Sequence, residues 1–142
     1  MGTISAFVEK TQYTQKLGTD VFCAENLLDF SKTNAAISDV VQALKVPANT
    51  IVKNVWCIVK TPEGSTAVAT LGDGASATGW DASVNLNAAA GTMTGGVPGT
   101  DAFASIGKFY ASEDTIDLVP SAALDTCKLV VKAEFMKIER YA

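Results

Sequence analysis

The side chains best suited to chemistry in this chain are carboxylates that stand next to turns. They are Asp73, Asp81, Asp114 and Asp117. Carboxylates at such positions usually accept hydrogen bonds from backbone N–H groups of the turn, and we favour this interpretation. Two alternatives stay open. One is a calcium site built from loop oxygens, although residues 71–74 do not follow the EF-hand ligand order; the other is glycosidase-like acid/base chemistry.

Other residue types that enzymes commonly need are missing from the sequence. The chain contains no histidine, which excludes Ser-His and Cys-His triads in their usual form. The sequence also lacks a phosphate-binding loop, a dinucleotide fingerprint and a zincin pattern. We therefore expect a protein that is not an enzyme and that needs no cofactor.

The cysteines indicate a structural role. Cys23, Cys57 and Cys127 are odd in number, widely spaced and set in apolar, strand-like surroundings. Without a CxxC pair or any histidine, the sequence has no zinc-like ligand spacing. We expect buried, reduced thiols and no metal site.

Two tryptophans are candidates for ligand contact. Trp56 stands between Val55 and Cys57 in a strand-like run, so we expect it in the core with its indole N–H bonded to a neighbour. Trp80 follows Gly79 in a loop. It could lie at the edge of the core or stack against a partner, and a sugar is a weaker third possibility.

The segment of residues 39–74 predicts a series of antiparallel strands. Apolar runs at 39–46, 51–60 and 67–74 are separated by Pro- and Gly-containing turns at 47–50 and 61–64. Pro presets φ for a turn, whereas β-branched residues suit a pleated, half-buried surface. We interpret the segment as an antiparallel meander.

Residues 127–135 show the clearest strand pattern. Cys127, Leu129, Val131, Ala133 and Phe135 alternate with Lys128, Val130, Lys132 and Glu134. This period of two predicts a strand with one face on the core, and its length suggests a central position.

The remaining strands complete a single domain. Strand-like residues occur at 27–30, and a hairpin is expected from 107–111 to 115–119 across the turn at 112–114. About eight strands result, which is enough for two packed sheets. The predicted fold is an all-β, antiparallel, jelly-roll-like sandwich over residues 19–142, preceded by an extended N-terminal arm at residues 1–18.

Two segments outside the regular strands are candidates for partner contact. The arm is mostly polar and is expected to order when it meets a neighbour. Residues 88–107 contain five glycines, which makes a regular element through the middle improbable; the loop is either a surface excursion without a role or a contact. The candidate contact residues are Phe7, Val8, Tyr13, Trp80, Met93, Val97 and Phe103, with Ile106 as a further apolar residue of the loop.

Composition narrows the choice of partner. Of 142 residues, 48% are hydrophobic and only 18% are charged, so part of the surface is expected to be covered by partners. A net charge of −4 and the absence of any Lys/Arg run argue against nucleic-acid binding. The sequence has no apolar stretch of membrane-spanning length and its beginning does not look like a signal peptide, so we expect synthesis in the host cytoplasm and no membrane contact.

Several short motifs, taken together in order, resemble small structural proteins of tailed bacteriophages. The motifs stand at residues 46–50, 55–56, 61–64, 71–74, 79–81, 84–88 and 111–118. The resemblance spans residue 28 to the C-terminus and implies a place on the virion. It favours a capsid decoration (cement) protein, a homotrimer on the outer surface of the head that contacts the major capsid protein. The alternative is a head-fibre or tail accessory module that binds a host receptor or glycan.

Overall fold

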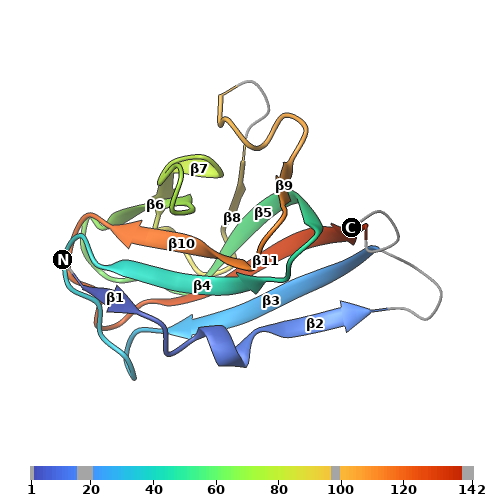
Figure 1. The fold of residues 1–142 in the computed structure, drawn as a ribbon. Helices are drawn as coiled ribbons and strands as arrows, with labels where there is room; N and C mark the ends of the chain where they lie inside the picture. Colours follow the sequence, from blue (N-terminus) through green and yellow to red (C-terminus); the bar gives the residue numbers. More distant parts are fainter. Residues whose placement is uncertain (1, 16–20, 97–99, 139–142) are drawn as a thin grey trace.

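The computed structural model describes residues 2–15, 21–96 and 100–138, and these residues form two β-sheets packed face to face (Figure 1). The five-stranded sheet has the order β1 (Thr3–Ile4), β4 (Val40–Val46), β10 (Asp114–Pro120), β6 (Val68–Gly72) and β7 (Asp81–Asn85). The six-stranded sheet has the order β2 (Gln12–Gln15), β3 (Val21–Asp29), β11 (Lys128–Lys137), β5 (Thr50–Thr61) and β8 (Met93–Gly95), and β9 (Lys108–Tyr110) also pairs with β5. A 3₁₀ turn, η1 (Val8–Lys10), links β1 to β2.

The strand order is that of a jelly roll. The four-stranded groups β3-β11-β5-β8 and β4-β10-β6-β7 belong to opposite sheets, and most steps along the chain cross from one group to the other. This arrangement of eight strands in two sheets defines the jelly-roll sandwich. The predicted all-β, jelly-roll-like fold is confirmed. Strand pairing is antiparallel throughout, apart from β1 and β4, which run parallel.

The predicted meander at residues 39–74 is wrong in its pairing, although its strands are present. β4 and β6 lie in the five-stranded sheet and β5 lies in the six-stranded sheet, so consecutive strands do not pair. Val46 and Thr50, at the two ends of the first connection, are both fully buried, and Asn49 between them has φ +56°. Four residue steps reach about 13 Å, which spans the roughly 10 Å between packed sheets. The connection is therefore an arch over the core.

The predicted hairpin at residues 107–119 is also corrected. β9 pairs with β5, whereas β10 pairs with β4 and β6 in the other sheet. The turn signal at 112–114 is real, but the chain changes sheets there. Short turns look alike in sequence whether they close a hairpin or cross a core.

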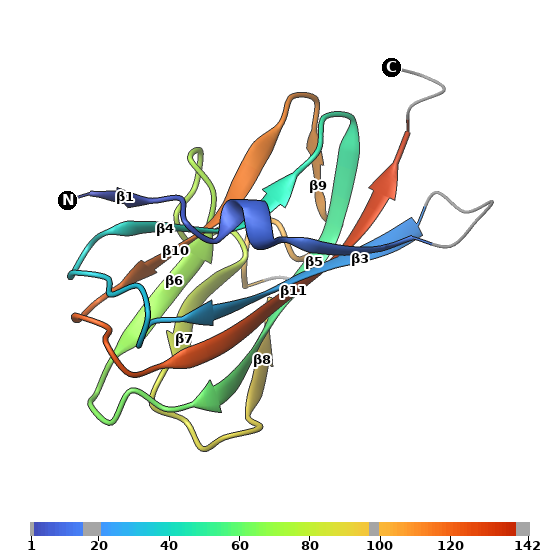
Figure 2. The ribbon, with the colours of Figure 1, turned by 90° about the horizontal axis from the view of Figure 1, so that it is seen from below.

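β11 is the centre of the six-stranded sheet, as the sequence predicted (Figure 2). It pairs with β3 on one side and β5 on the other over nearly its whole length. All five residues predicted to face inward, from Cys127 to Phe135, are fully buried. The period-two interpretation of this strand is confirmed.

The N-terminal segment is extended, but it belongs to the sandwich. Thr3 and Ile4 pair with Val40 and Val41 at one edge of the five-stranded sheet, and β2 pairs with β3 at one edge of the six-stranded sheet. The segment thus runs along an open side of the sandwich (Figure 2). The expected arm that waits for a neighbouring subunit is corrected for residues 2–15, because their partner is the sandwich of the same chain. Residues 16–18 of the expected arm lie outside the described residues.

Candidate interaction surface

Phe7 holds the N-terminal segment on the core. Its side chain is only 3% exposed and meets the ring of Phe30 edge to face at 5.7 Å. Buried Asn26 donates hydrogen bonds from Nδ2 to the Phe7 carbonyl and to the Ala43 carbonyl, the latter at 3.1 Å. One side chain of β3 therefore joins η1 to β4 of the opposite sheet. Phe7 is not available to a partner, which corrects its assignment as a contact residue.

Tyr13 remains partly accessible beside the same edge. Its ring packs on Phe22 and Phe135, and its hydroxyl donates to the Lys45 carbonyl at 2.8 Å. Burial and the nearby negative charge of Glu113 raise its pKa. With 43% of its surface exposed, Tyr13 can touch a partner, and Val8 on η1 is half-buried.

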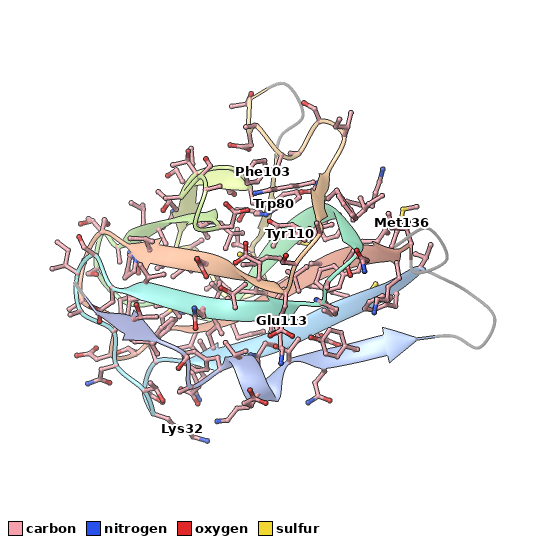
Figure 3. All side chains as sticks on the ribbon, viewed as in Figure 1. Lys32, Trp80, Phe103, Tyr110, Glu113 and Met136 are labelled. Atoms are coloured by element: carbon pink, nitrogen blue, oxygen red, sulfur yellow. The ribbon has the colours of Figure 1, made fainter. Side chains whose placement is uncertain are left out.

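Trp80 lies in the core beneath the segment between β8 and β9. The side chain is fully buried and its ring meets Phe103 edge to face at 5.3 Å (Figure 3). Its indole N–H donates to the Tyr110 hydroxyl at 3.4 Å. Of the two positions left open for Trp80, the core is correct. Trp56, expected in the core, lies half-buried on the outer face of the six-stranded sheet, because its neighbours Val55 and Cys57 point inward.

A buried polar cluster anchors β9 beside this ring. The Asp73 carboxylate, whose side chain has no exposed surface, accepts hydrogen bonds from Tyr110 Oη at 2.8 Å and from Lys108 Nζ. It also accepts the backbone N–H groups of Ala75 and Ser76, each at 2.9 Å. Burial alone would raise the pKa of Asp73, but these hydrogen bonds together hold it below its ordinary value. The cluster keeps the carboxylate charged inside the protein.

Phe103 packs closely because Gly79 gives its ring room, and Gly107 lets the chain turn after it. A Cβ on Gly79 would lie 2.1 Å from the Phe103 ring, and Gly107 has φ +87° where the chain turns back into β9. The Lys108 ammonium lies 4.4 Å from the centre of the same ring, within cation–π range. Phe103 is therefore half-buried, and much of its ring contacts residues of its own chain.

The expected irregular loop at residues 88–107 contains one short strand and exposes two apolar side chains. β8 pairs with β5 through residues Met93 to Gly95. Met93, at the start of β8, is 63% exposed, and Ile106, in the segment between β8 and β9, is 83% exposed. Val97 lies outside the described residues. Met93 and Ile106 are thus the accessible apolar residues of this loop.

Most of the carboxylates next to turns accept hydrogen bonds from backbone N–H groups, which is the interpretation favoured from the sequence. Asp81 accepts from Ser83 N at 2.9 Å and Asp114 from Thr115 N at 2.8 Å, in addition to the two turn N–H groups at Asp73. Asp117 differs, because it is 8% exposed and accepts from Thr115 Oγ1. Among the described residues there is no group of three or more His, Cys, Asp or Glu side chains that could hold a metal ion.

The three cysteines are free thiols. Cys57 and Cys127 are buried as expected, whereas Cys23 is half-buried on an outer sheet face. Burial raises the pKa of Cys127 to about 12, and burial also raises that of Cys57. Both buried thiols are therefore uncharged at neutral pH and behave as core side chains.

Four of the seven exposed large hydrophobic residues in the described part of the chain lie on the outer face of the six-stranded sheet, where two apolar rows cross the strands. The first row comprises Leu27, Val130, Ile58 and Met93, which stand opposite one another on β3, β11, β5 and β8. The second row comprises Val21, Met136, Ile51 and Phe109 on β3, β11, β5 and β9. Four of these residues, Val21, Leu27, Met93 and Phe109, are 47–63% exposed. We call these sets apolar row one and apolar row two.

Except for Met93, no residue of these rows was identified as a contact from the sequence. A signal was available in β5, where apolar residues occupy both faces from Val55 to Val59. Strands that are covered on both faces have such continuous apolar runs, whereas a strand with one solvated face alternates. The continuous apolar run at residues 55–59 therefore predicts that this part of the outer face meets a partner.

Comparison with solved structures shows the same fold in chains from phage capsids. A chain from the capsid of Ralstonia phage GP4 matches with a TM-score of 0.65 and 11% identity over 96% of this chain and 97% of that chain. A chain from the cyanophage Pam1 capsid asymmetric unit has a TM-score of 0.61 and 13% identity over 88% and 90% of the two chains. A chain from the acidic stable capsid of Helicobacter pylori bacteriophage KHP30 has a TM-score of 0.57 and 13% identity over 89% of this chain and 92% of that chain.

These likenesses define the fold, since identities this low carry no further information about function. The resemblance to phage structural proteins that the sequence suggested is thereby confirmed at the level of the fold. No protein-family model matches the chain, and no curated protein matches it in sequence. In the described part of the chain no helix is long and apolar enough to span a membrane.

Proposed function

We propose that this chain is a structural protein of a bacteriophage virion, and more specifically a capsid decoration (cement) protein. It binds the outer surface of the head and stabilises adjacent subunits of the major capsid protein. The observation that carries the proposal is the fold, which is shared over nearly the whole chain with chains from three phage capsids. Each of those chains is covered over at least 90% of its own length, so the likeness is to small separate subunits and not to a domain of a larger one.

The surface supports a role in binding large partners. A protein that works by burying area needs accessible apolar side chains on a rigid frame, and the two apolar rows lie on the most extensively paired sheet of the sandwich. The proposed assembly is a homotrimer, because a closed cyclic trimer matches a local threefold arrangement of coat subunits. Its subunit contacts come from loops and sheet edges.

The alternative, a module that binds a receptor or glycan, loses its main support. That reading relied on Trp80 as an accessible stacking platform, and Trp80 is fully buried with its N–H bonded to Tyr110. The other tryptophan, Trp56, is half-buried on the outer face of the six-stranded sheet, where it stands opposite Gly95 of β8. We therefore keep the decoration protein as the proposed function.

Heat-induced release of packaged DNA tests the proposal. A ligand that binds only the assembled head stabilises that state, so particles without the protein should assemble yet release DNA at a lower temperature. Adding back the purified protein should restore the higher temperature. Identical release curves with and without the protein would reject the cement role, and a loss of host attachment in its place would revive the receptor-binding alternative.

A further inference from the structure

The outer face of the six-stranded sheet has an arrangement of side chains that is complementary to itself. Two central rows separate the apolar rows: Glu25, Lys132 and Trp56 form one, and Cys23, Glu134 and Asn54 form the other. From Val130 to Met136 the outward residues of β11 are therefore Val130, Lys132, Glu134 and Met136, and Lys128 before them on the same face pairs with Asp29 of its own chain. If the direction of β11 is reversed, Val130 and Met136, which are both apolar, change places. Lys132 and Glu134, which carry opposite charges, also change places.

We propose that this face is an interface between two copies of the chain, related by a twofold axis that runs across the strands at the level of Ala133. Identical faces that pack on each other do so through a twofold axis, which makes each contact occur twice. With this axis, apolar row one of one copy covers apolar row two of its partner. Lys132 of each copy then faces the Glu134 position of the other.

Charge selects this axis over a twofold axis parallel to the strands. A twofold axis parallel to the strands would place Lys132 on Lys132 and Glu134 on Glu134, and like charges in direct contact disfavour an interface. The axis across the strands forms two opposite-charge pairs and no like-charge pair on β11. Within the described residues neither Lys132 nor Glu134 takes part in an ion pair, so both charges are available.

The face also has the size and composition that the contact needs. β11 is ten residues long, and four strands side by side give a face of about 33 by 19 Å, or about 630 Å², which lies at the lower end of the roughly 600–1,000 Å² per partner of stable interfaces. The outer face of the five-stranded sheet is different. Its half-buried outward side chains include Gln42, Lys45 and Thr70, without the large exposed apolar residues of the other face.

This inference does not depend on the proposed function. The twofold contact uses the face of one sheet, whereas the proposed trimer uses loops and sheet edges, so the two contacts can occur in one assembly. In that case the twofold contact links neighbouring trimers.

Sedimentation of the purified protein with charge-exchanged variants tests the proposal. Lys132→Glu and Glu134→Lys each create two like-charge contacts, so each should raise the dimer dissociation constant on the order of tenfold or more. The double variant K132E/E134K exchanges the two charges and should restore association to near the wild-type constant. Val130→Lys should abolish association, whereas the matched control Val119→Lys on the other sheet should leave it unchanged. Circular dichroism and the unfolding midpoint verify that each variant is folded.

Three results would overturn the proposal. The first is wild-type protein that does not form this twofold contact at a concentration of about 0.1 mM. That concentration is well above the micromolar dissociation constants of weak interfaces of this size. The second is association that responds equally to Val130→Lys and Val119→Lys. The third is a double variant that associates no better than the single ones. Capture of the monomer on heads that lack it, blocked by Val130→Lys, would assign the face to the coat protein instead.

Discussion

The Lys108 ammonium group lies 2.5 Å from the Asp73 carboxylate, and this ion pair joins β9 to the turn that follows β6. The pair is asymmetric, because the Asp73 side chain has no exposed surface and the Lys108 side chain is 25% exposed. A buried charge without its partner is costly, whereas an exposed one is solvated. Loss of Lys108 should therefore destabilise the buried Asp73 carboxylate more than loss of Asp73 would destabilise the Lys108 ammonium group.

Lys108→Met should destabilise the fold through that asymmetry. Asp73 keeps Tyr110 and two backbone donors, so we expect a loss of about 1–3 kcal/mol in the free energy of unfolding. The matched control is Lys128→Met, since Lys128 lies 3.8 Å from the more exposed Asp29 and its loss should cost within about 0.5 kcal/mol. Chemical denaturation measures both. Equal losses for the two variants would mean that the Asp73 pair contributes no more than a surface pair.

Asp117 should make the protein less stable as the pH rises through about 6. Burial, with further contributions from the charges of Asp114 and Asp73, raises its pKa to about 6 from the ordinary 3.8. Between these values the folded state binds more protons than the unfolded state, so the free energy of unfolding falls as the pH rises. At pH 7 the ionised Asp117 carboxylate therefore lowers the free energy of unfolding. Asp73 has the opposite sign, since its lowered pKa gives stability that is lost on acidification.

Asp117→Asn removes this cost. We expect the variant to be more stable at pH 7 by up to about 3 kcal/mol and to have a flatter stability profile between about pH 4 and 6. Asp125→Asn, at an exposed turn, changes the net charge equally and serves as the control. Unfolding midpoints at a series of pH values provide the measurement. A profile for Asp117→Asn parallel to that of the wild type would show that Asp117 binds protons equally in the folded and unfolded states and that its pKa is not raised by folding.

How much of this structure the sequence predicts depends on how local the signal is. The alternation around Val131 identified β11, its inward face and its central place, because period two is a property of consecutive residues. Pairing between consecutive strands was predicted wrongly, since the arch after Val46 and a hairpin turn use the same residue types. The Asp73–Lys108 pair joins positions 35 residues apart and leaves no local pattern.

Aromatic residues show the same limit. Trp56 was expected in the core and lies on the outer face of the sheet, because residues 55–59 are apolar on both faces and their period gave no direction. For Trp80 the sequence left the core edge and a partner contact open, and the core is correct. Phe7 stands alone in a polar segment, so no periodicity revealed that it is 3% exposed. In both cases the core was selected by tertiary packing, which single-sequence patterns do not contain.

Phe7→Ala should destabilise the whole domain, although the residue lies near the N-terminus. Its buried ring packs on Phe30, and truncation of a buried phenylalanine costs about 3–5 kcal/mol. Val8→Ala, at a half-buried neighbour, should cost about 1 kcal/mol or less. Thermal unfolding compares the two. A normal midpoint for Phe7→Ala would mean that the segment detaches readily and would restore the free-arm interpretation.

Phe135→Ala and Lys132→Ala separate the two faces of β11. Phe135 is fully buried and meets Phe22 edge to face at 5.4 Å, so its truncation should cost about 3–5 kcal/mol. Lys132 lies on the outer face, and in dilute solution its truncation should change the free energy of unfolding by no more than about 0.5 kcal/mol. At high protein concentration the two variants should respond differently. If the outer face is the proposed twofold interface, the wild-type midpoint rises with concentration and that of Lys132→Ala rises less, because association stabilises only the folded chain. A midpoint of Lys132→Ala that follows the wild type at every concentration would mean that Lys132 has no part in association, whereas the Phe135 result depends on the core alone.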